Sequence, residues 1–281
     1  GGCLVLHRGR LDPRSIMELI AARKVNYVSC SPSRASSFLD LADESEILFP
    51  GVESLRVGST YVPQPLREQI QDRLTPNLLI AYGITEIGTV SIAPPDMVRK
   101  IPGVVGAIAP GLSAEVVDEK GIVLPPETPG RLRIKGPGMI QSYFDAPEET
   151  QKAFRDGWFY SDDRVEFTCG GELIHHGRMD DMMIFDGVNI NPVEIENVIL
   201  RHPALSEAAA FAITDDVHGD VPFAAVVLRS KVSEAELLSY CQSRLGAHAP
   251  RDVFIVSDLP RNAAGKVIKS KLRHLFRSKA F

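Results

Sequence analysis

The first hundred residues alternate short apolar runs with amphipathic helical patterns, and this alternation constrains the fold more than any other feature. A buried strand is expected at 4–6, followed by a helix opened by Asp12-Pro13. Strands and helices are then expected in the order 25–29, 32–41, 55–57, 65–74 and 78–81. Strands that alternate with helices predict an α/β unit built on a parallel sheet. Such sheets bind ligands at the carboxyl ends of their strands.

Two segments follow predicted strands at that edge. The first is Gly58-Ser59-Thr60 and the second is Tyr82-Gly83-Ile84-Thr85-Glu86. In the second, an aromatic ring can stack on a flat base, and glycine lets another group approach the backbone closely. A hydroxyl and a carboxylate follow, as a phosphate and its Mg²⁺ require. A capped turn explains the same residues, and composition alone favours the turn.

From residue 104 the pattern changes to short strands separated by turns. These strands are expected at 114–117, 131–134, 165–167 and 172–176. They predict a β-rich, barrel-like subdomain over 104–179, after an α/β subdomain over 1–103. Gly103, Gly106 and Gly111 do not form a dinucleotide fingerprint, because no strand–glycine–helix context surrounds them.

The polar stretch 177–196 marks the passage to a second unit, in which Asn191 is expected to cap a helix that starts at Pro192. Further helices and strands are expected at 208–213, 223–228, 234–245, 253–256 and 270–276. They predict a small α+β domain over 180–281. Two groups of residues are not expected to bind metal: the crowded hairpin residues Asp215, Asp216, His218 and Asp220, and the strand-end and helix-end residues His175, His176 and His202.

Composition excludes several classes of protein. The net charge of -5 gives no electrostatic case for a nucleic-acid partner. No apolar run approaches the roughly 18 residues of a membrane span. The four cysteines lie far apart and form no C-x-x-C pair, which favours free buried thiols in a reducing, cytoplasmic location. The chain starts with glycine instead of methionine and has no signal-like segment, so it is expected to be a piece of a longer polypeptide.

Six motifs follow one another in a fixed order along the chain. They are Tyr82-Gly83-x-Thr85-Glu86; Gly130, Gly136, Tyr143 and Thr150; Gly157-Trp158-Phe159-x-Ser161-x-Asp163; Gly177-Arg178-x-Asp180-Asp181; Gly187 with Pro192-x-Glu194-Ile195-Glu196; and Leu259-Pro260-Arg261-x-x-x-Gly265-Lys266. In order and rough spacing the set resembles the adenylate-forming superfamily of acyl- and aryl-CoA synthetases, peptide-synthetase adenylation domains and luciferases. The resemblance covers nearly the whole chain, but only the C-terminal half or so of such an enzyme.

The resemblance implies a reaction in two steps. ATP with Mg²⁺ and a carboxylic acid give an acyl-adenylate and pyrophosphate, and a thiol then takes the acyl group. The thiol belongs to coenzyme A or to the pantetheine of a carrier protein. The resemblance also implies that the small domain is mobile and swings about a hinge at Asp180 between two poses, one for each step.

Site residues are implied motif by motif. Tyr82 would stack on adenine, Thr85 would contact the α-phosphate and Asp163 would accept the ribose hydroxyls. Glu86 would hold Mg²⁺, and Lys266 would be the catalytic cation near the carboxylate and the α-phosphate. The remaining assignments are nucleotide binding for Gly58, Ser59, Gly83 and Arg178; an acyl pocket at Thr60, Tyr61, Ile84 and Gly88; and a thiol channel at Gly187.

The chain departs from the family pattern at three places. Ser161-Asp162-Asp163 stands where Thr-Gly-Asp is usual, and the extra acid either weakens nucleotide binding or points to solvent. Lys269 stands where arginine is common. The Ser/Thr/Gly-rich phosphate loop is absent, and no other stretch replaces it. This chain without the missing N-terminal portion of its protein is therefore expected to adenylate poorly or not at all.

Three functions remain open on the sequence. The leading one is a carboxylate–CoA ligase, which Pro260-Arg261-Asn262 before the lysine loop favours. The second is an acyl or aminoacyl ligase that serves a carrier protein. The third is a non-catalytic remnant that binds a nucleotide. The sequence does not identify the carboxylic acid or the oligomeric state.

Overall fold

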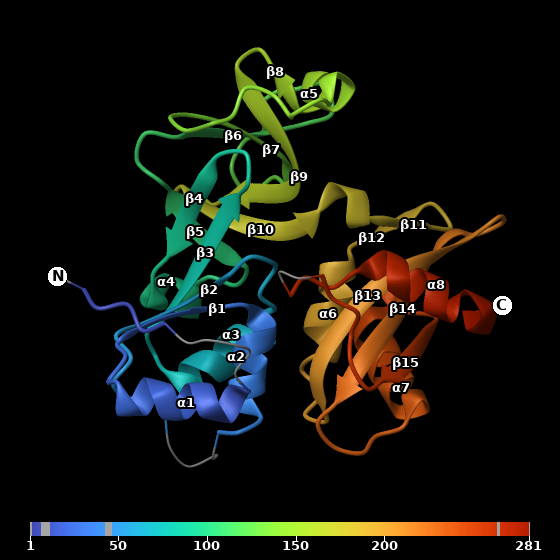
Figure 1. The fold of residues 1–281 in the computed structure, drawn as a ribbon. Coiled ribbons are helices and arrows are strands. Elements are labelled where there is room, and N and C mark those ends of the chain that lie inside the picture. The colour runs from blue at the N-terminus through green and yellow to red at the C-terminus, as the bar shows by residue number, and fades with distance from the viewer. Residues whose placement is uncertain (1, 7–11, 43–46, 263–264, 281) are drawn as a thin grey trace.

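Two β-sheets organise the chain, and they are joined by a single turn at 179–181 (Figure 1). The structure is a computed structural model, and it describes residues 2–6, 12–42, 47–262 and 265–280. The first half begins with the alternating elements α1 Pro13–Ala22, β1 Tyr27–Cys30, α2 Pro32–Leu39, β2 Ser54–Gly58, α3 Gln64–Gln69 and β3 Leu78–Ile84. A π-helical turn, Ile70–Leu74, extends α3. Strands β1, β2 and β3 are parallel, which confirms the α/β prediction.

After β3 the same sheet becomes antiparallel. Its further elements are β4 Gly88–Ala93, α4 Pro95–Lys100, β5 Val104–Ile108, β6 Ser113–Val117, β7 Gly130–Lys135, α5 Pro147–Ala153, β8 Phe154–Arg155, β9 Trp158–Phe167 and β10 Glu172–Arg178. The strand order is β1-β2-β3-β4-β5-β10-β9-β7-β6, with β8 paired to β9. The change of direction therefore falls between β3 and β4, before residue 104. The barrel-like part does not close, because its strands extend the α/β sheet instead.

The second sheet carries helices on both faces. Its elements are β11 Met183–Phe185, β12 Val188–Ile190, α6 Pro192–Ile199, β13 Leu205–Asp215, β14 Gly219–Leu228, α7 Glu234–Leu245, β15 Asp252–Val256 and α8 Lys269–Ala280. Ile195 of α6 and Leu237 of α7 pack against one face. Phe276 of α8 stacks on Phe254 and Phe211 of the other face, with ring centroids 4.2 and 6.1 Å away. Successive side chains of β13 and β14 point to opposite faces of the sheet, so these strands contribute to the hydrophobic cores on both faces.

Three local predictions differ from the structure. The run 4–6 forms no strand, and Leu4 and Leu6 are 79% and 82% exposed, because no strand of the described chain pairs with it. Tyr82 does not close β3, which continues to Ile84 by pairing with β4. Two of the four cysteines expected to be buried, Cys3 and Cys169, are exposed instead. The acid-rich segment 215–220 is the predicted hairpin, between β13 and β14.

Two glycine substitutions test the close approach of β5 to β4. Gly106 has φ +109°, and a Cβ there would lie 2.3 Å from the carbonyl of Ile92. Gly138 has a similar left-handed φ of +83°, with nothing within 4 Å of a Cβ. Gly106→Ala is expected to lower the free energy of unfolding by about 3 kcal/mol or more, from strain plus overpacking. Gly138→Ala adds only backbone strain and is expected to lower the free energy of unfolding by about 1–2 kcal/mol. Denaturant unfolding measures both values. An equal loss of unfolding free energy in the two variants would contradict the requirement for glycine where β5 approaches β4.

Candidate active site

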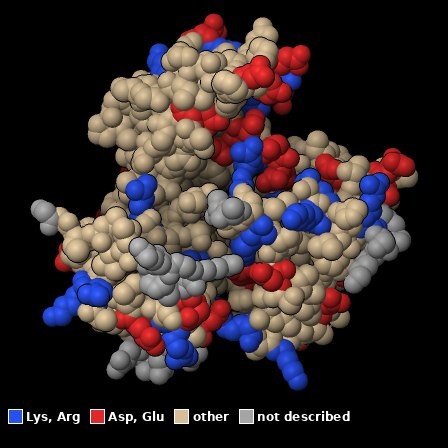
Figure 2. Space-filling model, viewed as in Figure 1, with Lys and Arg blue, Asp and Glu red and all other residues tan. Residues whose placement is uncertain are grey.

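A cavity of about 740 Å³ lies between the first sheet and the second unit. Acidic and basic side chains gather on the face where the two units meet (Figure 2). Most of the site residues expected from the sequence line this cavity: Ser59, Thr60, Tyr61, Tyr82, Gly83, Ile84, Thr85, Glu86, Asp163, Arg178, Asp180 and Lys266. The strand ends of the first sheet and the lysine loop of the second unit therefore meet at one place.

Three expected site residues do not line the cavity. Gly58 ends β2, where a Cβ would lie 2.4 Å from the carbonyl oxygen of Ala81, so glycine is required for the close approach of β2 and β3. Gly88 is exposed at the start of β4. Gly187 lies in the exposed turn between β11 and β12. In this arrangement neither Gly88 nor Gly187 contributes to the cavity wall.

Asp163 is held from two sides at the floor of the cavity. The Tyr82 hydroxyl donates to Asp163 Oδ2 at 2.5 Å, and His175 Nε2 lies 3.3 Å from Oδ1. Burial alone would raise the pKa of Asp163, but His175, Tyr82 and the charge of Arg178 together lower it. Burial, aided by the neighbouring carboxylate, raises the pKa of Tyr82. At neutral pH the pair is therefore a carboxylate and a neutral phenol.

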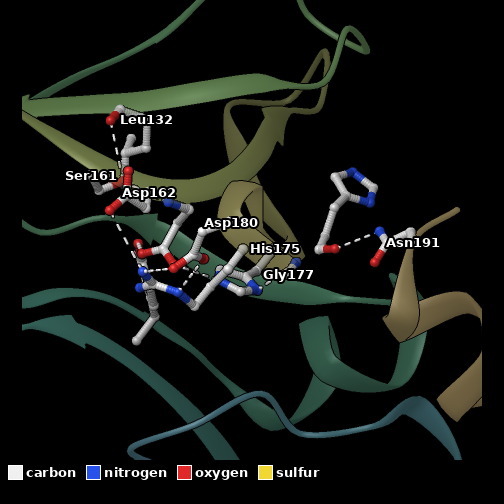
Figure 3. A network of polar contacts seen from close by, with 11 residues as sticks. Leu132, Ser161, Asp162, His175, Gly177, Asp180 and Asn191 are labelled. Carbon is white, nitrogen blue, oxygen red and sulfur yellow. Dashed lines mark hydrogen bonds and ion pairs between the residues drawn. The ribbon is translucent and has the colours of Figure 1, made fainter. Parts of the chain in front are cut away.

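Arg178 forms a two-pronged ion pair with the expected hinge residue. Its Nε and Nη2 lie 2.7 and 2.8 Å from the two carboxylate oxygens of Asp180. This pairing raises the pKa of Arg178 and lowers that of Asp180. The extra acid Asp162 is 53% exposed and lies between Arg178, at 3.6 Å, and Arg131, at 3.8 Å. Asp162, Asp180 and His175 belong to one network of polar contacts (Figure 3). Asp162 is therefore both paired and solvated.

Glu86 stands at the turn between β3 and β4. Its Oε1 accepts a 2.6 Å hydrogen bond from the Tyr143 hydroxyl, and the Tyr143 amide donates to Thr150 Oγ1 at 3.0 Å. Burial, followed by the bond to Glu86, raises the pKa of Tyr143. No group of three or more candidate ligands that could hold a metal ion occurs in the described part of the chain. One carboxylate suits a Mg²⁺ ion that takes its other ligands from phosphates and water.

Lys266 reaches the cavity from a tight loop. Gly265 has φ +83°, and the Lys266 amide donates to Asn262 Oδ1 at 2.9 Å. Arg261 closes the loop by donating to the Gly265 carbonyl at 3.1 Å. The Lys266 side chain is exposed, and its charge is one of those that lower the pKa of Asp180. The lysine charge is therefore felt at the turn that joins the two sheets.

Polar contacts hold the second unit in this position. Asn197 of α6 donates to the Tyr61 hydroxyl and accepts from the Gln64 amide, both at 3.0 Å. Within the second unit, Lys269, at the start of α8, lies 3.3 Å from Glu196 of α6 and 3.7 Å from Asp181 of the connecting turn. A lysine in place of the family's usual arginine thus pairs with two acids.

The sequence did not indicate His175 or Asn197 as site residues. A signal for His175 was present, because strict alternation along 172–178 puts it on the same face as Leu173 and Gly177, and all three are buried. Nothing in the sequence marked Asn197, since its partners lie in a different unit.

Comparison with known proteins identifies the family of this chain. Residues 1–144 match the AMP-binding enzyme family, and residues 194–266 match the AMP-binding enzyme C-terminal domain. A 2-succinylbenzoate–CoA ligase of Bacillus subtilis is 31% identical over 97% of this chain and 55% of its own length. ATP-bound MatB from Rhodopseudomonas palustris superposes with a TM-score of 0.85 at 30% identity, over 97% of this chain and 55% of that one. The Bacillus subtilis o-succinylbenzoate CoA synthetase in complex with its acyl-adenylate intermediate superposes with a TM-score of 0.80 at 28% identity. The match covers 94% of this chain and 54% of that one.

The fold is that of the adenylate-forming enzymes. The chain belongs to the AMP-binding enzyme family. It spans a little over half the length of the curated relatives it matches.

Proposed function

We propose that this chain is part of an ATP-dependent carboxylate–CoA ligase that works through an acyl-adenylate. One observation carries the proposal: Tyr82, Glu86, Asp163 and Arg178 of the first sheet and Lys266 of the second unit surround a single cavity. CoA ligases recur among the similar proteins, which supports the choice of reaction. Over the described residues, no helix combines the length and apolar character needed to cross a membrane.

In the proposed first step a carboxylate oxygen attacks the α-phosphorus of ATP and pyrophosphate leaves. Tyr82 stacks on adenine, Asp163 accepts the ribose hydroxyls and Thr85 contacts the α-phosphate. Glu86 binds Mg²⁺, which neutralises charge on the phosphates when it is present. Lys266 places a cation where negative charge develops, so that its effect falls on the transition state.

In the proposed second step a thiolate of coenzyme A attacks the acyl carbon and AMP leaves. The second unit turns about Asp180, which withdraws Lys266 and brings the exposed turn at Gly187 toward the thiol. A hinge of this kind needs only one or two residues that absorb a change of φ and ψ. The present arrangement, with Lys266 on the cavity, supports assignment to the first pose.

Product analysis tests this proposal. The native polypeptide that contains this chain is supplied with ATP, Mg²⁺, coenzyme A and a panel of aliphatic and aromatic carboxylic acids. Mass spectrometry is expected to detect AMP together with an acyl-CoA for at least one acid. A pantetheine-bearing carrier protein in place of coenzyme A tests the other acceptor. Binding of AMP without any acyl product would instead favour a non-catalytic nucleotide-binding protein.

A further inference from the structure

His175 lies inside the site but has no part in the function proposed above. It is in the middle of β10 and only 9% exposed. Its ring lies between two aromatic rings of the cavity, with centroids 6.0 Å from Tyr61 and 5.3 Å from Tyr82. The same tyrosine, Tyr82, donates a hydrogen bond to Asp163. The imidazole therefore contacts both members of the pair that forms the cavity floor.

The backbone determines which ring nitrogen of His175 carries the proton. The Gly177 amide donates to His175 Nδ1 at 3.1 Å, so Nδ1 must present a lone pair. In a neutral imidazole the proton is then on Nε2. Nε2 faces Asp163 Oδ1 at 3.3 Å, within reach of a hydrogen bond. Two residues of one strand thus aim a single N–H donor at the carboxylate.

We propose that His175 is a positioning residue that orients the Asp163 carboxylate for the ribose of the nucleotide. The inference rests on the proposed function, because it takes Asp163 to be the ribose acceptor. Tyr82 donates to Oδ2 of the carboxylate, and His175 Nε2 lies 3.3 Å from Oδ1. Two anchors fix the plane of the group and leave its other lone pairs for ligand hydroxyls. Removal of one anchor lets the carboxylate rotate about its remaining bond.

Two amide substitutions separate the two hydrogen bonds of the imidazole. In His175→Gln the side-chain amide reaches the position of Nε2 and keeps a donor for Asp163. In His175→Asn the shorter amide reaches only the position of Nδ1, so it keeps an acceptor for Gly177 and loses the donor. A general packing role of the ring would make the two variants equally harmful. A positioning role makes the asparagine variant worse.

The experiment measures the dissociation constant of AMP for wild type and both variants, and the KM for ATP in the native polypeptide. His175→Asn is expected to weaken AMP binding and raise this KM about tenfold, the effect of one hydrogen bond to a charged group. His175→Gln is expected to stay within about threefold of wild type, and kcat at saturating ATP is expected to change little in either. Equal effects of the two substitutions, or a fall in kcat alone, would overturn the inference.

The tautomer provides a test that needs no substitution. Nitrogen-15 shifts of the wild-type imidazole are expected to report a proton on Nε2 and a lone pair on Nδ1. A proton on Nδ1 would overturn the inference even if both variants failed to fold. If the wild type failed to bind AMP, the proposed function itself would be contradicted. If His175→Asn bound AMP as the wild type does, only the positioning role of His175 would be contradicted.

Discussion

Replacing Lys266 with alanine is expected to slow formation of the acyl-adenylate by about 10²–10³-fold or more, the effect of deleting one preorganised electrostatic partner. The structure supports this expectation because Lys266 lines the cavity and its side chain takes no part in the two hydrogen bonds beside it. These bonds join the Lys266 amide to Asn262 Oδ1 and the Arg261 side chain to the Gly265 carbonyl. The measurement is the rate of the first half-reaction in the native polypeptide at saturating ATP and acid.

The second half-reaction gives the discriminating comparison for this variant. Thioester formation from preformed acyl-adenylate is expected to be nearly unchanged, because Lys266 acts only in the adenylating pose. Lys271→Ala, a change of another exposed lysine five residues later, provides the matched control and should leave both rates at wild-type values. A similar loss in both half-reactions of Lys266→Ala would indicate a structural role, and no loss would remove Lys266 from the mechanism.

Replacing Asp180 with proline is expected to separate the two half-reactions in the opposite sense. Asp180 lies in the short turn between β10 and β11, the only covalent connection between the two sheets. Proline fixes φ, which restricts rotation at this point. Adenylation should be largely preserved, because the present arrangement already has Lys266 on the cavity. Thioester formation should fall about 10²-fold, because the thiol and the acyl carbon would be misplaced.

The proline variant also removes the ion pair with Arg178, so a control is required. Asp180→Ala loses the same two hydrogen bonds but leaves φ free. It is therefore expected to lose nucleotide affinity without a selective loss of thioester formation. If the alanine variant matches the proline variant in both half-reactions, the effect belongs to the ion pair and Asp180 is not a hinge.

Local sequence signals predicted most elements of the fold. Asn191 caps α6 by accepting a hydrogen bond from the Val193 amide at 3.0 Å, and Pro192 starts the helix, as expected. Helix α7 spans residues 234–245, as expected, and Ser233 caps it by accepting a hydrogen bond from the Glu236 amide. These features depend on neighbours within one turn of helix, and sequence patterns report such neighbours directly.

Features that depend on pairing between distant segments were less predictable. The run 4–6 has the composition of a buried strand, but burial requires a partner that the described chain does not supply. The position of His175 beside Asp163 depends on the register of β9 against β10, where Arg178 is opposite Asp163 and a bulge separates it from His175. A shift of one residue would turn the imidazole to the other face, and spacing alone does not determine that register.

ATP–pyrophosphate exchange tests whether this cavity activates a carboxylate with ATP. The native polypeptide is incubated with ATP, Mg²⁺, labelled pyrophosphate and one carboxylic acid at a time, without coenzyme A. Exchange is expected to require a particular acid, to need no thiol and to be lost in Lys266→Ala. Absence of exchange with every acid, from a protein that still binds AMP, would contradict it.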